Sequence, residues 1–245
     1  TLILLSWFKR VVWTLHDTSI LTGGCIQPAE CKTFGKGCGN CPQLGRWPLN
    51  TSVDLTNWIL KFKRICLKLS RVEYVVPSIW LQKLCYQQLG ILPKLIRNGV
   101  NKDLFYEQSS HRKKKQLSYI KVLISASNLR DENKVNFRFL QFFDDYRPDE
   151  ILILLMGNAD NLKLNTKFPI KKLGYIDDEI QKAKIYNEAD ALIFPSMGDN
   201  CPLTILEAVS CGLPVVCFSN SGMKELISLL KLTELNDKPR LLDNL

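Results

Sequence analysis

The sequence has no apolar run near the length that crosses a membrane. A bilayer-spanning helix needs about 20 consecutive apolar residues. The longest run here, Ile151–Met156, lies between Glu150 and Asn158. It is typical of one buried strand, so the sequence excludes a chain that crosses the bilayer as an apolar helix.

The start of the chain lacks the basic segment that opens a secretory signal peptide. Thr1 is not a start methionine, which indicates that the chain begins within a longer protein. Internal repeats and long low-complexity tracts are also missing. Their absence and the ordinary composition, 46% hydrophobic and 23% charged, exclude a disordered chain, a collagen and a coiled coil.

The length of 245 residues predicts one and a half to two domains, at about 150 residues per domain. Lys and Arg number 33 against 24 Asp and Glu, which gives a net charge of +9. This surplus favours an anionic partner such as a phosphate group or an acidic membrane face. Aromatic residues do not alternate with the basic clusters, so no nucleic acid partner is expected.

The nine cysteines are an odd number, and they divide into two groups. Five lie among apolar neighbours and are typical of small buried hydrophobic residues: Cys66, Cys85, Cys201, Cys211 and Cys217. This usage favours a reducing compartment, so the expected location is the cytoplasm, at the inner face of the membrane if the basic surface binds lipid.

The other four cysteines lie in a Gly-rich stretch, Thr18–Asn50, which shows no helical or strand period: Cys25, Cys31, Cys38 and Cys41. Four thiolates can enclose a tetrahedral zinc ion, and the closing C-x-x-C suits such a site. The first pair is spaced more widely than in the usual zinc ribbons. Structural zinc and free or paired thiols therefore stay open as alternatives.

The first half of the chain predicts strands at Val11–Leu15, Tyr74–Val76 and Lys94–Ile96, and a helix that Ser78 caps and Gly90 closes. Apolar residues at three- and four-residue steps predict a further helix over residues 55–69. Between the apolar positions of that helix and just after its end, the chain carries basic residues: Lys61, Lys63, Arg64, Lys68 and Arg71. A solvated face and a membrane-contacting face both fit this pattern.

The polar segment 107–117 is predicted to link a first domain, residues 1–106, to a second, residues 118–245. In the second domain, strands alternate with helices, which predicts an α/β fold with a mostly parallel sheet. The strands are expected at Ile120–Ser125, Ile151–Gly157, Lys172–Ile176, Ala191–Pro195 and Val215–Phe218, and the helices at Lys134–Tyr146, Asp178–Glu188, Pro202–Cys211 and Met223–Leu230. Ligands of such sheets bind beyond the carboxyl ends of the strands.

The most informative segment is Ala189–Phe218, in which a strand, a loop and a helix follow one another. Asp199 lies in the loop, and Glu207 lies on the helix that begins near Pro202. Unpaired N–H groups at a helix start suit an anion, and a carboxylate nearby accepts hydrogen bonds from sugar hydroxyls. The segment therefore predicts a site for a phosphorylated sugar compound.

The same segment resembles the sugar-donor motif of retaining glycosyltransferases of family 4, which have the GT-B fold. That motif is an acid, seven residues and Glu, followed by Ala-x-x-Cys-Gly-x-Pro-Val-Val. Here it runs from Asp199 through Glu207 to Val216, with Asp where the family more often has Glu. The resemblance implies that Asp199 contacts the transferred sugar and Glu207 the ribose. It places Asn200, Cys201, Pro202 and Leu203 at the donor as well.

Two further segments resemble the family's diphosphate-binding loops. Ser125–Lys134 corresponds to a segment in which basic residues hold the diphosphate, and Lys134 matches the family's lysine. Asn128 or a neighbour stands at the arginine position, for which Arg130 is expected to compensate, and Val135 replaces the family's glycine. Asn220–Glu225 resembles the family's Gly-Gly-x-x-Glu turn, with Ser221 in place of one glycine and Gly222 as the other.

The first half adds Trp13–Asp17 and the Cys-rich segment Gly37–Leu44, which resemble a subgroup that builds bacterial surface polysaccharides of the colanic acid type. His16 follows a strand, and the resemblance places it near the reacting sugar. Asp17 is expected to orient His16 or to cap the loop.

The resemblance implies two Rossmann-like domains in the GT-B arrangement, with the first incomplete and the chain truncated at both ends. It implies a hexosyltransferase that moves a sugar from a UDP- or GDP-linked donor to a carbohydrate or lipid-linked acceptor with retention. No metal or cofactor is expected for the chemistry. The alternatives are a non-catalytic nucleotide-binding remnant, a basic binding module and a sugar-nucleotide epimerase, which shares this architecture.

Overall fold

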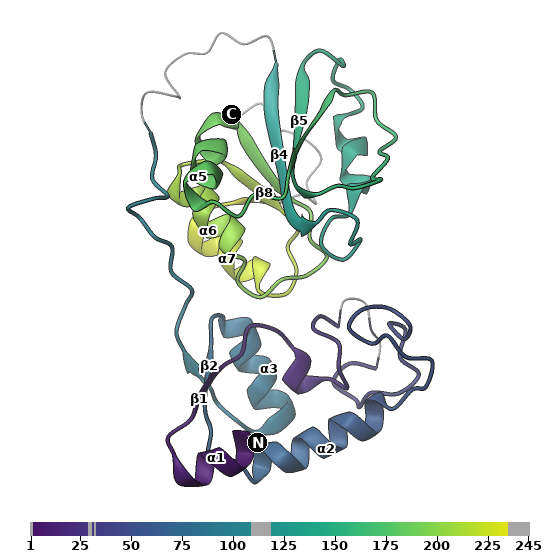
Figure 1. The fold of residues 1–245 in the computed structure, drawn as a ribbon, viewed down its shortest axis with the longest axis vertical. Helices are drawn as coiled ribbons and strands as arrows, with labels where there is room; N and C mark the ends of the chain where they lie inside the picture. The colour runs from purple at the N-terminus through teal and green to yellow at the C-terminus, as the bar shows by residue number, and fades with distance from the viewer. Residues whose placement is uncertain (1, 29–30, 32, 109–118, 235–245) are drawn as a thin grey trace. The chain divides into compact units, whose positions relative to one another are not determined.

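The computed structural model describes residues 2–28, 31, 33–108 and 119–234, and these form two units (Figure 1). Unit 1 comprises Thr1–Asn98 together with Asp199–Cys201. Unit 2 comprises Gly99–Gly198 and Pro202–Leu245. Most of the predicted linker, residues 107–117, lies outside the described residues, so the linker and the domain limits at 106 and 118 stay predictions.

Unit 1 is built on a parallel sheet in the order β1-β2-β3. Its strands are β1 (Val12–Thr14), β2 (Glu73–Val76) and β3 (Lys94–Leu95), and its helices are α1 (Leu2–Phe8), the 3-10 turn η1 (Ser19–Leu21), α2 (Thr56–Lys68) and α3 (Ile79–Leu89). Its buried core includes Leu21, Leu67, Val76 and Leu81. The strands and helices predicted for this half are confirmed, whereas the sequence pattern did not predict α1.

Local chemistry explains the limits of α3. The Ser78 hydroxyl accepts a hydrogen bond from the Leu81 N–H, which satisfies one of the first unpaired donors of the helix. Gly90 ends the helix with φ 68°, in the left-handed region that glycine adopts without steric cost. Both limits are confirmed as predicted.

Side chains of α2 hold the long irregular segment between η1 and α2. The Asn57 amide donates to the Cys38 carbonyl at 2.7 Å. The Lys63 ammonium donates to the Ser19 carbonyl at 2.8 Å and to the Thr22 carbonyl at 3.2 Å. These bonds order backbone that forms little regular structure of its own.

Unit 2 is built on a six-stranded parallel sheet in the order β6-β5-β4-β7-β8-β9. The strands are β4 (Ile120–Asn128), β5 (Ile151–Asn158), β6 (Ile170–Gly174), β7 (Ala191–Phe194), β8 (Val215–Cys217) and β9 (Thr233–Glu234). The chain runs outward from β4 to β6, returns to the other side of β4 and continues through β7 to β9. This is the doubly wound order, with its switch point between β4 and β7.

Within the described residues, three α-helices and a 3-10 helix accompany this sheet: η2 (Phe137–Phe143), α5 (Glu179–Glu188), α6 (Leu203–Ser210) and α7 (Met223–Leu230). The core includes Val122, Ile153, Leu155, Phe139 and Ile193. The predicted parallel α/β architecture is confirmed. Helix α5 begins one residue after its predicted start, and Asp178 is its cap.

Two predicted elements of unit 2 differ from the structure. Instead of a helix over residues 134–146, the chain forms the shorter 3-10 helix η2. The Asn136 N–H bonds to the Pro195 carbonyl at 3.1 Å, which ties the preceding residues into the loop beyond β7. The strand expected at Lys172–Ile176 begins earlier, because Ile170 pairs with Ile153 of β5.

Candidate functional site

The loops that follow β4 and β7 meet at the switch point of unit 2. The Met197 N–H bonds to the Asn133 carbonyl at 2.9 Å, and the Ser196 hydroxyl donates to the same oxygen at 3.3 Å. The Asn136–Pro195 bond joins the two loops a second time. These contacts lie beyond the carboxyl ends of adjacent parallel strands, where the sequence predicted a ligand.

The two basic candidates lie in the first of these loops. Lys134 is half-buried, and its N–H bonds to the Asp131 carbonyl at 2.9 Å within a tight turn. Arg130 is exposed, and its N–H bonds to the Asn128 side chain at 3.1 Å. Backbone hydrogen bonds fix the main chain of Lys134 and Arg130 beside the switch point. Basic residues at this place are suited to hold an anion.

The loop after β8 joins this cluster through Asn220, whose amide donates to the Ser196 carbonyl at 3.4 Å. Ser221 follows with φ 48°, in the left-handed region that favours glycine. Gly222 is the N-cap of α7 with φ −70°, a value that any residue adopts. The strained position of this turn is therefore Ser221, which stands where the Gly-Gly-x-x-Glu turn of family 4 has a glycine.

Helices α6 and α7 follow β7 and β8, and both begin without a side-chain cap. Their N-cap residues are Pro202 and Gly222. By contrast, the caps of α3 and α5, Ser78 and Asp178, accept hydrogen bonds from the first turn. The first N–H of α7, that of Met223, bonds to the Asn220 carbonyl at 2.9 Å. The start of each helix is the positive end of its dipole, which attracts an anion.

The segment Asp199–Cys201 belongs to unit 1, where Asn200 is its buried centre. The Ser78 hydroxyl donates to the Asn200 side-chain oxygen, and the Asn200 amide donates to the His16 carbonyl at 3.1 Å. The Asn200 N–H also bonds to the Asp199 carboxylate at 2.8 Å. Asn200 therefore connects the two residues predicted as catalytic, His16 and Asp199.

The remaining contacts complete this part of unit 1. The Asn98 amide donates to the Cys201 carbonyl at 2.9 Å. The Asp17 carboxylate accepts from the Ser19 N–H at 2.8 Å, so Asp17 caps the loop, the second of the two roles expected for it. The His16 side chain is exposed just beyond β1. The sequence predicts only a helix cap for Ser78 and a turn for Asn98. Their hydrogen bonds to Asn200 and Cys201 join residues more than 100 positions apart, so no sequence motif indicates them.

Glu207 lies half-buried on α6, where the Tyr186 hydroxyl of α5 donates to its Oε2 at 3.0 Å. Burial raises the pKa of Glu207 above its usual range. The hydrogen bond from Tyr186 and the charge of Lys182 lower this pKa, while the charge of Glu179 raises it. No sequence motif marks Tyr186 as part of the site.

Structural zinc and free or paired thiols stay open as alternatives for Cys25, Cys31, Cys38 and Cys41. All four are free thiols, although they are near enough to influence one another's pKa. Burial raises the pKa of the Cys25 thiol to about 11. Among the described residues, no group of three or more His, Cys, Asp or Glu side chains could hold a metal ion.

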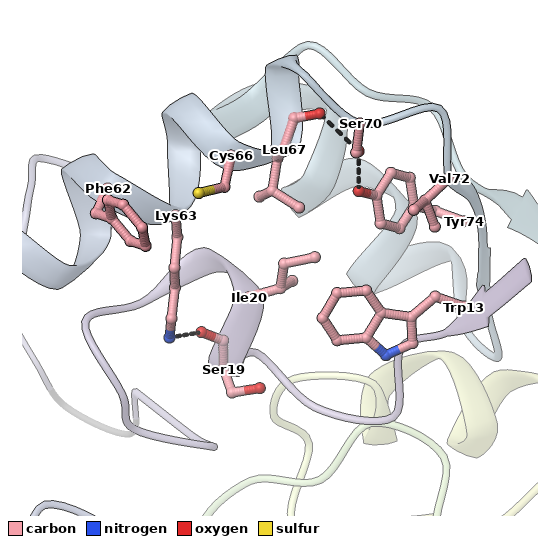
Figure 2. Close-up of a pocket in the computed structure, with 10 residues that line it drawn as sticks. All are labelled: Trp13, Ser19, Ile20, Phe62, Lys63, Cys66, Leu67, Ser70, Val72 and Tyr74. Atoms are coloured by element: carbon pink, nitrogen blue, oxygen red, sulfur yellow. Dashed lines mark hydrogen bonds between the residues drawn. The ribbon is translucent and has the colours of Figure 1, made fainter. Parts of the chain in front are cut away.

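Unit 1 also contains an apolar pocket of about 410 Å³ (Figure 2). Figure 2 shows Phe62, Lys63 and Cys66 of α2 on one side and Trp13 and Tyr74 of the sheet on the other. The charged residue in its lining, Lys63, donates to backbone carbonyl oxygens. None of the predicted site residues lines this pocket, so it is separate from the donor-site candidates.

The outer surface of α2 is both apolar and basic. Trp58, Phe62 and Ile65 are exposed by 74%, 59% and 59%. Lys61 and Lys68 are exposed on the same helix. Within the described part of the chain, the structure has no helix of sufficient length and apolarity to cross a bilayer.

Comparison with known proteins agrees with this arrangement. Residues 120–234 match the family model described as "Glycosyl transferases group 1". The chain is 25% identical over 238 residues to the "Putative colanic acid biosynthesis glycosyl transferase WcaC" of Escherichia coli K12. This match covers 89% of the chain and 54% of WcaC, so the chain spans about half the length of that relative.

Solved structures of low sequence identity share the fold. WaaG, a glycosyltransferase involved in lipopolysaccharide biosynthesis, matches with a TM-score of 0.62 at 14% identity, over 89% of this chain and 58% of WaaG. Sucrose-phosphate synthase from Thermosynechococcus elongatus matches with a TM-score of 0.57 at 18% identity, over 73% and 49% of the two chains.

Anabaena Alr3699/HepE, solved with UDP and glucose, matches with a TM-score of 0.55 at 20% identity, over 69% of this chain and 50% of that one. The α/β architecture of both units, the doubly wound sheet of unit 2 and these matches identify the fold as GT-B, as the sequence predicted. Residues 120–234, a little under half of this chain, are thus similar to the group 1 glycosyl transferases.

Proposed function

We propose that this chain carries the sugar-donor site of a retaining glycosyltransferase. The enzyme would move a sugar from a UDP- or GDP-linked donor to a carbohydrate or lipid-linked acceptor. The observation that carries this proposal is the meeting of the loops after β4, β7 and β8 at the switch point of the sheet in unit 2. The crevice beyond the carboxyl ends of such strands is where nucleotides bind in doubly wound sheets.

The proposed roles follow from the chemistry of each residue. Glu207 accepts hydrogen bonds from the ribose hydroxyls, and Asp199 accepts them from the transferred sugar. Lys134 and the uncapped N-termini of α6 and α7 attract the diphosphate. His16 is proposed to help position the transferred sugar. Transfer develops negative charge on the departing diphosphate, which fixed positive groups stabilise without reorganisation.

A role in polysaccharide biosynthesis is proposed from the relatives. WcaC is named for colanic acid biosynthesis, and WaaG acts in lipopolysaccharide biosynthesis. The subgroup motif around His16 and Cys38 in the first half of this chain agrees with these relatives. The acceptor is therefore proposed to be a growing or lipid-linked carbohydrate.

The test is calorimetric titration of the chain with UDP and with GDP. Saturable binding of one nucleotide would support the donor site and identify the base. Uridine and guanosine serve as controls, because binding that depends on Lys134 and the helix N-termini requires the diphosphate. A folded chain that binds neither nucleotide would overturn the proposal, whereas nucleotide binding without sugar transfer would indicate a non-catalytic remnant.

The outer face of α2 is proposed to bind the anionic inner surface of the membrane, where a lipid-linked acceptor would lie. An amphipathic helix with exposed aromatic and basic residues lies in the membrane interface with its apolar face inserted. Trp58 and Phe62 supply the apolar contact, and Lys61 and Lys68 the charge.

The membrane proposal is tested by sedimentation with phosphatidylcholine vesicles that contain or lack phosphatidylglycerol. The chain is expected to bind the anionic vesicles more tightly, and W58S/F62S to lose about tenfold or more in affinity. K61E/K68E should remove the preference for anionic lipid, at about 1 kcal/mol per charge. Tyr175→Ser, which changes an exposed aromatic of unit 2, is the control. Equal binding to neutral vesicles would contradict the charge argument.

A further inference from the structure

Tyr186 is a buried tyrosine whose hydroxyl contacts the proposed ribose ligand, Glu207. Its side chain is 1% exposed and comes from α5, whereas Glu207 lies on α6. The hydroxyl donates to Glu207 Oε2 at 3.0 Å and also interacts with Thr204, one turn earlier on α6. A buried tyrosine hydroxyl needs a polar partner, and this one has a carboxylate.

Contacts on the other side of Tyr186 hold it in place. Its ring packs against Phe105, with ring centroids 6.1 Å apart. The neighbouring Asn187 donates to the Tyr106 carbonyl at 3.1 Å and accepts from the Gln108 N–H at 2.8 Å. Helix α5 is thus fixed to the segment 105–108, and the Tyr186 ring is enclosed between that segment and α6.

We propose that Tyr186 is a positioning residue: its hydroxyl fixes the Glu207 carboxylate in the orientation and in the ionised form that accept hydrogen bonds from the hydroxyls of the donor nucleotide. This inference rests on the proposed function, since it assigns Tyr186 a part in the same site. Tyr186 acts through Glu207 and is not itself assigned a contact with the nucleotide.

The electrostatic surroundings explain why Glu207 requires such a partner. Burial raises its pKa, and a protonated carboxyl would donate a hydrogen bond where two acceptors are needed. Lys182 of α5 favours the ionised form, whereas Glu179 of the same helix opposes it. The hydrogen bond from Tyr186 also lowers the pKa of Glu207, so it opposes the effect of burial.

The first experiment needs no nucleotide. The carboxyl carbon of Glu207 is titrated by NMR in the wild type, Y186F and Y175F, with its signal assigned from E207Q. The pKa of Glu207 is expected to rise in Y186F and to stay unchanged in Y175F, whose tyrosine is exposed. An unchanged pKa in a folded Y186F would overturn the proposal.

The second experiment measures UDP and GDP affinity against pH. At pH 8, Y186F is expected to bind the preferred nucleotide about 3- to 10-fold more weakly, the range of one hydrogen bond. The difference should widen as the pH falls, because Glu207 protonates at a higher pH in Y186F. A difference that does not vary with pH would contradict the ionisation role.

A double-mutant cycle separates positioning from simple core packing. The effect of Y186F on affinity should disappear in the E207Q background if Tyr186 acts through the Glu207 charge. A loss of the same size in both backgrounds would overturn the inference. If the wild type binds neither nucleotide, the proposed function fails, and the NMR titration still decides whether Tyr186 controls Glu207.

Discussion

Replacement of Glu207 by alanine is expected to weaken binding of the preferred nucleotide, UDP or GDP, by about 10- to 100-fold. A hydrogen bond to a charged group contributes about 1.5–3 kcal/mol, and 1.4 kcal/mol corresponds to a tenfold change. Calorimetric titration at pH 8 measures the loss. Glu188→Ala is the matched control, because Glu188 lies on α5 in a loose surface pair with Lys184 at 4.0 Å. That variant should bind like the wild type.

Glu207→Gln separates the binding role of this residue from folding. Because burial raises the pKa of Glu207, its ionised form costs stability at neutral pH. The glutamine variant should therefore be at least as stable as the wild type at pH 7, and this difference should vanish below the usual glutamate pKa of about 4.3. If Glu207→Gln binds the nucleotide more weakly but is as stable as the wild type, the loss of affinity comes from the binding site and not from unfolding. Wild-type affinity in Glu207→Ala would contradict the assignment.

Replacement of Gly157 by alanine is expected to destabilise unit 2 by about 3–5 kcal/mol. Gly157 lies in β5 with φ 137°, and an added Cβ would lie 1.7 Å from the Ala126 carbonyl oxygen of β4. The backbones of two adjacent strands would have to separate near the ends that carry the proposed site. Urea unfolding followed by circular dichroism measures the loss.

Gly174→Ala is the control for the Gly157 prediction. Gly174 is also left-handed, with φ 77°, but an added Cβ there has no atom within 4 Å. The Gly174→Ala variant should lose only about 1 kcal/mol of stability, because alanine is strained at this backbone angle. Equal losses in the two variants would contradict the argument that the contact with Ala126 dominates.

The sequence predicted those elements that have local physical causes. The Ser78 cap and the left-handed Gly90 define α3 by bonds within a few residues, so the pattern was sufficient. The helix predicted over residues 134–146 is the shorter η2, and the Asn136 N–H before it bonds to the Pro195 carbonyl, a contact that no local pattern predicts. Strand β6 was misplaced for the same reason, since pairing with β5 sets its register.

The Cys-rich loop shows another limit of sequence patterns. Cysteine spacing indicates which side chains can gather, and the structure does bring the four thiols near one another. Spacing does not determine burial or the directions of the side chains. Those depend on how α2 holds the loop through Asn57 and Lys63.

The sequence by itself determined the parallel α/β class, the motif from Asp199 to Val216 and the residue types suited to a sugar nucleotide. Only the tertiary structure decided which residues surround them: Tyr186 donates to Glu207, and Asn200 contacts His16, which lies 184 positions earlier. The physical reason is that propensity and periodicity act over a few residues, whereas contacts at the ends of parallel strands depend on the order of the strands in the sheet.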